Sequence, residues 1–304
     1  MKPSAVWPRV LLGGTPVDLF DDDVAIDTII DHVRGPQPWP LGVMSANLDH
    51  IHHFGHHGPS ARVPFLWAHP DAGEPFPGGS RTGVHGDTGP DRGEGATAVR
   101  WLNLLDGAPL VRQASHLTGH PWPRLAGSDL IGPLLDRAEA ERIRVGFLGG
   151  MPEVLTTLAR RLAEERPDLP VTGLWSPDRA DLDDPTRCRA WARRARDAGT
   201  ELLVVGLGKP RQERWIVEHG PATGASVLLA FGAVVDFLAG AVQRAPEAVR
   251  DHGMEWAWRL ALEPRRLARR YLVDGPPAFT VLARRSFVLM PWTPEPVPTT
   301  AGRS

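Results

Sequence analysis

The segment from residue 202 to residue 271 decides the fold class of this chain. It contains LLVVGLGKPRQERWI (202–216), VLLAFGAVVDFLAGAVQRAP (227–246) and MEWAWRLALEPRRLARRY (254–271). The first two pieces each begin with a short apolar run, typical of a buried strand, and continue into a glycine-containing loop. Loops at the carboxyl ends of parallel strands are where open α/β sheets bind ligands. The arginine-rich third piece favours a ligand that carries phosphate.

Upstream of this segment, short apolar runs alternate with amphipathic stretches. In 153–165, for example, Leu155, Leu158 and Leu162 recur at helical spacing. We interpret residues 13–18, which begin with Gly-Gly, as a turn. Strands are predicted at 9–12, 42–45, 99–105, 144–148, 171–174, 202–205 and 227–231. The pattern predicts an α/β fold of the Rossmann-like type, with a mostly parallel sheet and helices on both faces.

Composition excludes several classes of protein. Hydrophobic residues make up 42% of the 304 residues, which is enough for a sizeable core. The net charge of −2 gives no indication of a nucleic-acid partner. Cys188 is the single cysteine, so we expect no intrachain disulfide, which suits the cytoplasm. Residues 1–9 do not resemble a signal peptide, and no run of about 18 apolar residues predicts a membrane-spanning helix.

Composition also divides the chain into parts. Residues 1–246 form the predicted α/β core, interrupted at about 58–98 by a stretch without periodicity that we interpret as an irregular insertion. Residues 247–291 form a predicted basic helical appendage, since 244–285 contains nine Arg, five Asp or Glu and no Lys. Residues 292–304 are rich in Pro and Thr and predict a disordered tail.

The sequence GLGKPRQE (206–213) is the most specific motif. Its two glycines permit a close approach to the backbone, and a helix that begins near Gln212 presents free N–H groups to an anion. A Gly-x-Gly alone is weak evidence of a nucleotide site, because this loop has neither the third glycine of a dinucleotide fingerprint nor the Lys-Ser/Thr end of a P-loop. The fuller pattern Gly-x-Pro-x-Gln-Glu after a buried strand is far more specific.

In their order and spacing, these segments resemble the WecG/TagA/CpsF glycosyltransferases (glycosyltransferase family 26). The resemblance is carried by Gly-x-Pro-x-Gln-Glu at 208–213, Gly-x-x-x-Asp at 232–236, Glu-Trp-x-x-Arg at 255–259, Glu-Pro-Arg-Arg at 263–266 and Asp-Gly at 106–107. At 45–47 this chain has Ser-Ala-Asn where the family has Thr-x-Asn. The resemblance implies an inverting transferase of cell-surface or extracellular polysaccharide biosynthesis. Such an enzyme moves a sugar, most often of the N-acetylmannosamine type, from a UDP-sugar to a polyprenyl-diphosphate-linked acceptor.

The resemblance also implies roles for individual residues. Asp106 is implied as the catalytic base, and the chemistry agrees, because inverting transfer needs one carboxylate to take the proton of the acceptor hydroxyl. Glycosidases, in contrast, need a pair of carboxylates. The arginines of the appendage are implied to neutralise the departing diphosphate in place of a metal ion, so no metal and no cofactor are expected. The residues implied to bind substrate are Ser45, Asn47, Gly107, Asp129, Gly206, Gly208, Pro210, Gln212, Glu213, Gly232, Asp236, Arg259, Arg265, Arg266, Arg269 and Arg270.

Plain structural roles stay open for several of these residues. Asn47 and Asp236 suit helix caps, and Glu213 suits the first turn of a helix. Asp106-Gly107 is by itself an ordinary turn signal. The basic run after residue 246 suits a solvated helix face.

Clusters of histidine and of aspartate raise the question of a metal site. The histidines at 50–57 suggest zinc, but they lack ordered Cys or acidic partners apart from Asp49, so we interpret them as the polar end of a helix. The acidic runs Asp21–Asp23 and Asp181–Asp184 are interpreted as caps and loops, because neither follows a predicted buried strand. The histidines in question are His50, His52, His53, His56 and His57.

The appendage also predicts a membrane contact. Its apolar side chains and those of 287–292 suit an anionic bilayer surface, which predicts a cytoplasmic protein bound peripherally to the inner face of the cell membrane. The apolar side chains of the appendage are Trp256, Trp258, Leu260 and Leu262. A homo-oligomer stays open, as do a catalytically silent scaffold of a polysaccharide-assembly complex and another nucleotide-binding enzyme with a Rossmann-like sheet.

Overall fold

The computed structural model describes residues 8–55, 58, 99–241, 246, 249, 255–262 and 264–290. Apart from Gly58, the predicted insertion at 58–98 therefore lies outside the described residues, and so does the predicted tail at 292–304.

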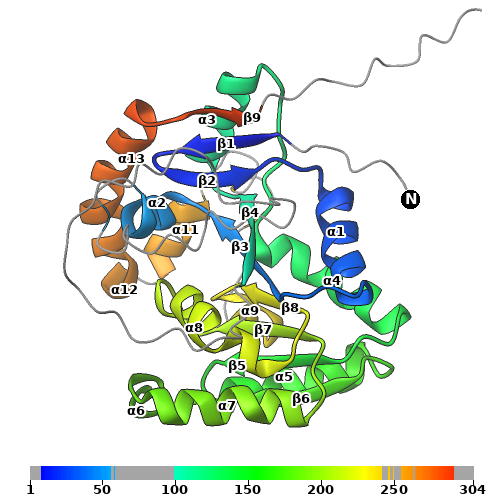
Figure 1. Cartoon of the computed structure of the whole chain (residues 1–304). Helices are drawn as coiled ribbons and strands as arrows, with labels where there is room; N and C mark the ends of the chain where they lie inside the picture. The colour runs from blue at the N-terminus through cyan, green and yellow to red at the C-terminus, as the bar shows by residue number, and fades with distance from the viewer. Residues whose placement is uncertain are drawn as a thin grey trace, which may run out of the picture.

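Within the described ranges, nine strands form one sheet in the order β6-β5-β7-β8-β3-β4-β2-β1-β9 (Figure 1). Neighbouring strands from β6 to β2 run parallel, whereas β1 pairs antiparallel with β2 and with β9. The sheet confirms the predicted Rossmann-like, mostly parallel α/β fold. The strands are β1 (Arg9–Leu12), β2 (Thr15–Asp18), β3 (Leu41–Ala46), β4 (Arg100–Leu105), β5 (Val145–Gly149), β6 (Val171–Trp175), β7 (Leu202–Gly206), β8 (Val227–Ala230) and β9 (Phe287–Met290).

Helices cover both faces of the sheet, and a second group lies near its ends. The covering helices are α1 (Asp22–Arg34), α2 (Leu48–Phe54), α3 (Ala108–Thr118), α4 (Gly127–Ala140), α5 (Pro152–Glu165), α7 (Pro185–Asp197), α8 (Arg211–His219), α9 (Val234–Leu238) and α13 (Gly275–Arg284). The others are α6 (Arg179–Asp183), the 3-10 helix η2 (Gly220–Thr223), α11 (Glu255–Leu262), α12 (Pro264–Ala268) and the π-helix η3 (Arg269–Asp274).

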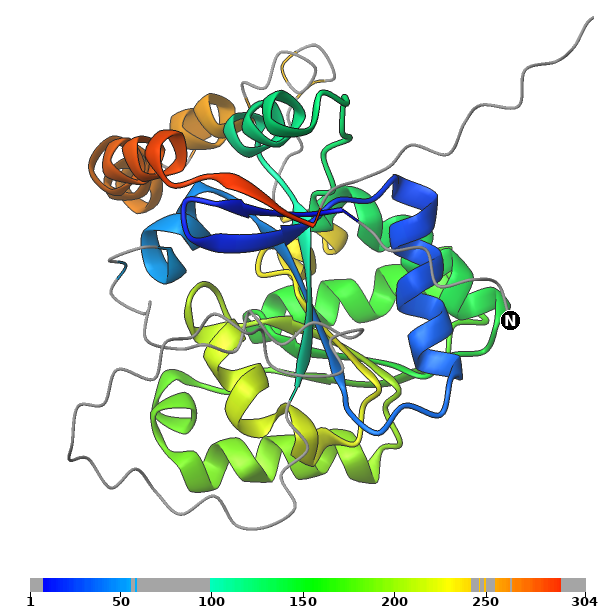
Figure 2. The same ribbon diagram turned by 45° about the horizontal axis from the view of Figure 1, so that its top comes forward.

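Side chains alternate between the two faces of the sheet and build two apolar clusters. On β4, Leu102 and Leu104 belong to a cluster covered by α1, α4, α5 and α9. Trp101 and Leu105 of the same strand belong to the second cluster, covered by α2, α3, α7, α8 and α13. Figure 2 shows α1 and α4 on one side of the sheet and α2, α8 and α13 on the other. Both faces are therefore buried, as the apolar strands predict.

Residues 13–18 form the turn of a β-hairpin and its second strand, β2. The prediction that the whole segment is a turn is therefore wrong. The first two residues, both glycine, make the turn with positive φ angles of 58° and 89°. A buried ion pair at 3.0 Å between Arg9 Nε and Asp18 Oδ1 joins β1 to β2. Asp18 Oδ2 also accepts a hydrogen bond from the N–H of Asn103 on β4 at 2.8 Å. The four residues of β2, of which Val17 is the main apolar one, give too short a pattern to identify a strand.

The acidic run Asp21–Asp23 consequently does follow a buried strand, contrary to the prediction. It still begins a helix, as predicted: Asp21 occupies the N-cap position of α1, and Asp22 and Asp23 lie in the first turn. The positive end of the helix dipole favours acidic side chains there. All three residues are exposed.

The C-terminal segment is part of the sheet. Residues 287–290, predicted as a membrane contact and not as a strand, form edge strand β9 against β1. The N–H of Gly13 donates to Ser286 Oγ at 3.0 Å, just before this strand. Helix α13 buries Ala278 and Leu282 in the second apolar cluster. The division of the chain at residue 246 stays a prediction, but a chain cut there would lack strand β9 and both core residues.

We expect Leu282→Ala to lower the free energy of unfolding by about 2–5 kcal/mol, because this side chain is 2% exposed and its removal leaves a cavity. Phe279, three residues earlier on the same helix, is 53% exposed, so Phe279→Ala is the control and should cost less than about 1 kcal/mol. Urea unfolding followed by circular dichroism measures both. Equally small losses would show that α13 is not anchored in the core.

Candidate active site

The predicted base lies at the carboxyl end of β4, beside the end of β3. The two strands pair in parallel with Ala46 opposite Leu105, so the residues that follow them, Asn47 and Asp106, become neighbours. Asn47 Nδ2 donates a hydrogen bond to Asp106 Oδ2 at 3.3 Å. Gly107, at φ 84°, then turns the chain into α3. Both polar side chains are partly exposed, so a ligand can reach them.

Asn47 caps α2 and holds Asp106 at the same time. Its Oδ1 accepts a hydrogen bond from the N–H of Asp49 at 3.2 Å, which leaves Nδ2 for the carboxylate. An amide side chain has one acceptor end and one donor end, so the cap fixes which end faces Asp106. The structure therefore confirms that Asn47 caps a helix, and its contact with substrate stays a prediction. Ser45, two residues earlier, is almost fully buried, and its Oγ has no hydrogen-bond partner among the described residues.

A buried pair of titratable side chains lies behind this contact. His50 Nδ1 accepts a hydrogen bond from the backbone N–H of Asn47 at 3.2 Å, which completes a capping box. His50 Nε2 faces Glu213 Oε1 at 3.3 Å, and both side chains are 0% exposed. Gln212 Nε2 donates to the same oxygen at 2.9 Å and to the carbonyl of Ala230 at 2.7 Å. These bonds tie α2 to α8 and to the end of β8.

Burial has a strong effect on the charge of Glu213. It raises the pKa of this carboxyl group to about 7, and the positive charge of Lys209 opposes the rise. Glu213 lies in the first turn of α8, which confirms that interpretation of its place. Because Gln212 and Glu213 are both fully buried, their contact with substrate stays a prediction.

The glycine-containing loops after β7 and β8 touch each other. A Cβ added at Gly232 would lie 2.8 Å from Gln212 Oε1 and 3.6 Å from Gly208 Cα, so a side chain there would displace the buried Gln212 amide. Gly206 is similarly close to Gly232, since its added Cβ would lie 3.4 Å from the Gly232 carbonyl oxygen. Gly208, at φ 78°, faces open space. The loops converge beside the start of α8, where Pro210 is the N-cap residue.

A further basic residue approaches the same edge of the sheet. The N–H of Leu125 donates to the carbonyl of Leu105 at 2.6 Å, which returns the chain to the end of β4. Arg124 next to it donates from Nη2 to Asp129 Oδ2 at 2.7 Å. The structure thus places the predicted Asp129 close to the end of β4, in a pair with an arginine that sequence analysis did not single out. No local pattern around Arg124 marks it, because its position depends on the return of the chain to β4.

The structure places the side chains of only some of the predicted arginines of the appendage. Arg269 Nε lies 3.9 Å from Asp274 Oδ2 and its side chain is 85% exposed, and Arg265 is exposed as well. Among the described contacts, neither arginine touches Asp106. Asp274 also lies 3.9 Å from Nε2 of His52 on α2, so the appendage meets the helix that Asn47 caps. The side chains of Arg259, Arg266 and Arg270 lie outside the described residues; Asp236 is half-buried in the first turn of α9.

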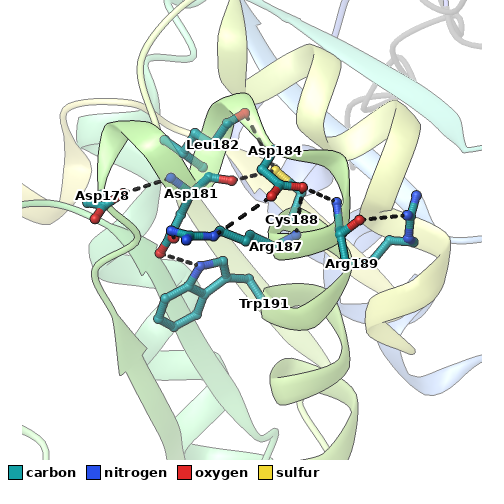
Figure 3. Close-up of polar contacts among 9 residues, drawn as sticks. Asp178, Asp181, Leu182, Asp184, Arg187, Cys188, Arg189 and Trp191 are labelled. Atoms are coloured by element: carbon teal, nitrogen blue, oxygen red, sulfur yellow. Dashed lines mark hydrogen bonds and ion pairs between the residues drawn. The ribbon is translucent and has the colours of Figure 1, made fainter.

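The second acidic run acts in helix capping, as predicted. Figure 3 shows Asp181 between Arg187, which donates to its Oδ1 at 2.7 Å, and the indole of Trp191, which donates to its Oδ2 at 3.1 Å. Asp178 caps α6 through the N–H of Asp181, and Asp184 caps α7 through that of Thr186. The part of the chain that the structure describes contains no group of three or more His, Cys, Asp or Glu side chains placed to hold a metal ion. The predicted histidines His56 and His57 lie outside it.

A comparison with protein families identifies the chain. The profile of the glycosyl transferase WecG/TagA/CpsF family matches residues 94–290. The chain belongs to this family. It is therefore a glycosyltransferase of cell-surface polysaccharide biosynthesis, with a nucleotide-sugar donor and a lipid-linked acceptor as its kinds of partner. The match begins after Ser45 and Asn47, and geometry joins these two to the family segment, since β3 pairs with β4 and Asn47 contacts Asp106. None of the described helices combines the length and the apolar character needed to cross a bilayer.

The raised pKa of Glu213 predicts a pH dependence of stability. Folding raises this pKa from an ordinary value near 4.5 to about 7, so between these values the folded chain binds more protons than the unfolded chain. The contribution of Glu213 to the free energy of unfolding should therefore fall, by up to roughly 3 kcal/mol, as the pH rises from about 4.5 to about 7, and stay constant above. Glu213→Gln should remove this fall. Urea unfolding at pH 5, 6, 7 and 8 compares the variant with the wild type and with Glu218→Gln, an exposed control on α8. Parallel pH profiles in all three proteins would contradict the burial argument.

Proposed function

We propose that this chain is an inverting transferase that moves a sugar of the N-acetylmannosamine type from its UDP derivative to a polyprenyl-diphosphate-linked acceptor. One observation carries the proposal: in a chain of this glycosyltransferase family, a reachable carboxylate, Asp106, stands at the carboxyl end of β4 and is held by Asn47 at 3.3 Å. Ligands of open α/β sheets bind at this edge.

The chemistry assigned to Asp106 is that of a general base. As the acceptor hydroxyl oxygen attacks the anomeric carbon, Asp106 takes the hydroxyl proton, and the bond from that carbon to the diphosphate breaks with its electron pair leaving on UDP. Attack from the side opposite to the leaving group inverts the anomeric centre. The amide of Asn47 occupies Oδ2, which leaves the other oxygen of the carboxylate to receive the proton.

The donor is assigned to the neighbouring loops. Gly208 faces open space at the start of α8, whose first N–H groups favour an anion such as diphosphate. The exposed guanidinium groups of Arg265 and Arg269, together with Arg259, Arg266 and Arg270, supply the positive charge that many transferases take from a metal ion. The proposal is therefore a metal-independent transfer.

The appendage is assigned to the membrane surface. Among the described residues it exposes Leu262, Leu272, Val273 and Phe279, on the same stretch as the exposed arginines. Apolar side chains beside basic ones suit an anionic bilayer. The proposed location is the cytoplasmic face of the cell membrane, where a polyprenyl-linked acceptor would be within reach.

We expect Asp106→Asn to lower turnover by about 10²–10⁴-fold, the usual contribution of general-base catalysis, while donor binding persists. Release of UDP from UDP-N-acetylmannosamine in the presence of a synthetic polyprenyl-diphosphate-linked sugar measures turnover. The rise in melting temperature on addition of the UDP-sugar measures binding. Asp168→Asn, a change at an exposed residue far along the chain, is the control. Turnover near the wild-type value in Asp106→Asn would exclude the proposed base, and no rise in melting temperature with any UDP-sugar would exclude the donor class.

Replacing Leu272 and Val273 together by Ser should weaken binding to vesicles of phosphatidylglycerol and phosphatidylcholine by about thirtyfold, since each exposed apolar side chain that enters a bilayer contributes on the order of 1 kcal/mol. Met151→Ser removes an equally exposed apolar side chain at the start of α5 and should leave binding unchanged. Co-sedimentation at rising salt should show weaker binding of the wild type as screening increases. Equal binding by all three proteins would refute this surface.

A further inference from the structure

The buried pair His50–Glu213 has no part in the proposed chemistry, although it lies directly behind the base. Both side chains are 0% exposed, so neither can touch an acceptor or a donor without rearrangement. A carboxyl group in such a place costs free energy unless hydrogen bonds compensate for its lost hydration. The hydrogen bonds that the Glu213 carboxyl group makes therefore indicate its role.

Hydrogen bonding fixes the protonation state of His50. Its Nδ1 accepts from the backbone N–H of Asn47, so the ring proton is on Nε2 and is donated to Glu213 Oε1. Both ring nitrogens are engaged, and the imidazole has no free lone pair with which to take a proton from a substrate. This excludes His50 as the catalytic base and leaves it the role of a rigid link.

The link connects the sheet to the base. Gln212 anchors the Glu213 carboxylate to the carbonyl of Ala230 at the end of β8. Glu213 holds His50, and His50 holds the backbone of Asn47. The other groups that affect the charge of Glu213 are Lys209 before α8 and, on α2, Asp49 and His53.

The need for such a link follows from the length of α2. A helix of seven residues has little stability of its own, so its first turn would fray without outside contacts. Asn47 is the cap of that turn, and its amide is the group that holds Asp106. Movement of the cap would move the side-chain amide of Asn47 away from the Asp106 carboxylate.

We propose that His50 and Glu213 are positioning residues for the base, which fix the backbone of Asn47 and through its amide the orientation of Asp106. This inference rests on the proposed role of Asp106. It adds two residues that contact no substrate but set the geometry of the group that does.

Kinetics of single and double variants test the inference. His50→Ala and Glu213→Leu, which removes the oxygen that accepts from His50, should each lower kcat about 10–100-fold, because a misplaced reacting group costs rate of this order, with KM for UDP-N-acetylmannosamine changed less than about twofold. His50→Gln should recover much of the loss, since glutamine at this position of a capping box accepts from the cap N–H. In the Asp106→Asn background, His50→Ala should cause no further loss. Glu218→Gln, a change at an exposed residue of α8, is the control and should keep the wild-type kcat.

A second measurement does not depend on turnover. The side-chain amide signal of Asn47 in a ¹H–¹⁵N spectrum, assigned by its loss in Asn47→Ala, should shift and broaden in His50→Ala and Glu213→Leu and stay unchanged in Glu218→Gln. Glu213→Leu removes the acceptor, keeps much of the side-chain volume and serves where His50→Ala does not fold. The inference is overturned if the Asn47 signal and kcat are both unaffected, or if His50→Ala is equally damaging with and without Asp106. A wild-type protein without transferase activity would count against the proposed function alone, and the Asn47 signal would then decide whether the pair positions this residue.

Discussion

The parallel pairing of β3 with β4 is the constraint on which the site depends. With Ala46 opposite Leu105, the first residues beyond the two strands must emerge side by side, although they are 59 positions apart in the chain. The sheet therefore brings Asn47 and Asp106 close together without any contribution from the loops themselves. What the loops add is orientation, through a helix cap on one side and a positive-φ glycine on the other.

Polar groups behind the site hydrogen-bond mainly to one another, although Gln212 Oε1 and Glu213 Oε2 have no hydrogen-bond partner among the described residues. His50, Gln212 and Glu213 are fully buried, and each has at least one hydrogen bond to another member of the group. Burial makes such bonds strong and makes a missing partner expensive, so the group acts as one rigid unit. The raised pKa of Glu213 reflects the cost of keeping a carboxyl group there.

The sequence predicts those elements whose signals are local. Strands β7 and β8 were expected within one or two residues, because each is an apolar run followed by a glycine-containing loop. The sequence does not predict strands β2 and β9, since β2 has Val17 as its main apolar residue and β9 pairs with a strand at the other end of the chain. In the site, Asp106 and Asn47 were identified through the family resemblance, as each alone is an ordinary turn or cap residue. The contact of His50 with Glu213, across 163 positions, and the place of Arg124 have no local signal and required the fold.

Helix α2 joins the C-terminal segment to Asp106, the proposed base. Its first residues meet Asp106 through Asn47, its buried side meets Glu213, and its remaining surface packs against α13 and lies near Asp274 of η3. A helix this short depends on its neighbours for its position. The appendage and Asp106 are therefore both positioned relative to α2. Strand β9 and the buried residues of α13 anchor the appendage to the sheet as well. The proposed transfer to a polyprenyl-diphosphate-linked acceptor would need such a fixed relation, since the acceptor hydroxyl would stand only a diphosphate and a sugar away from the bilayer, and the proposed base would have to be held at that height.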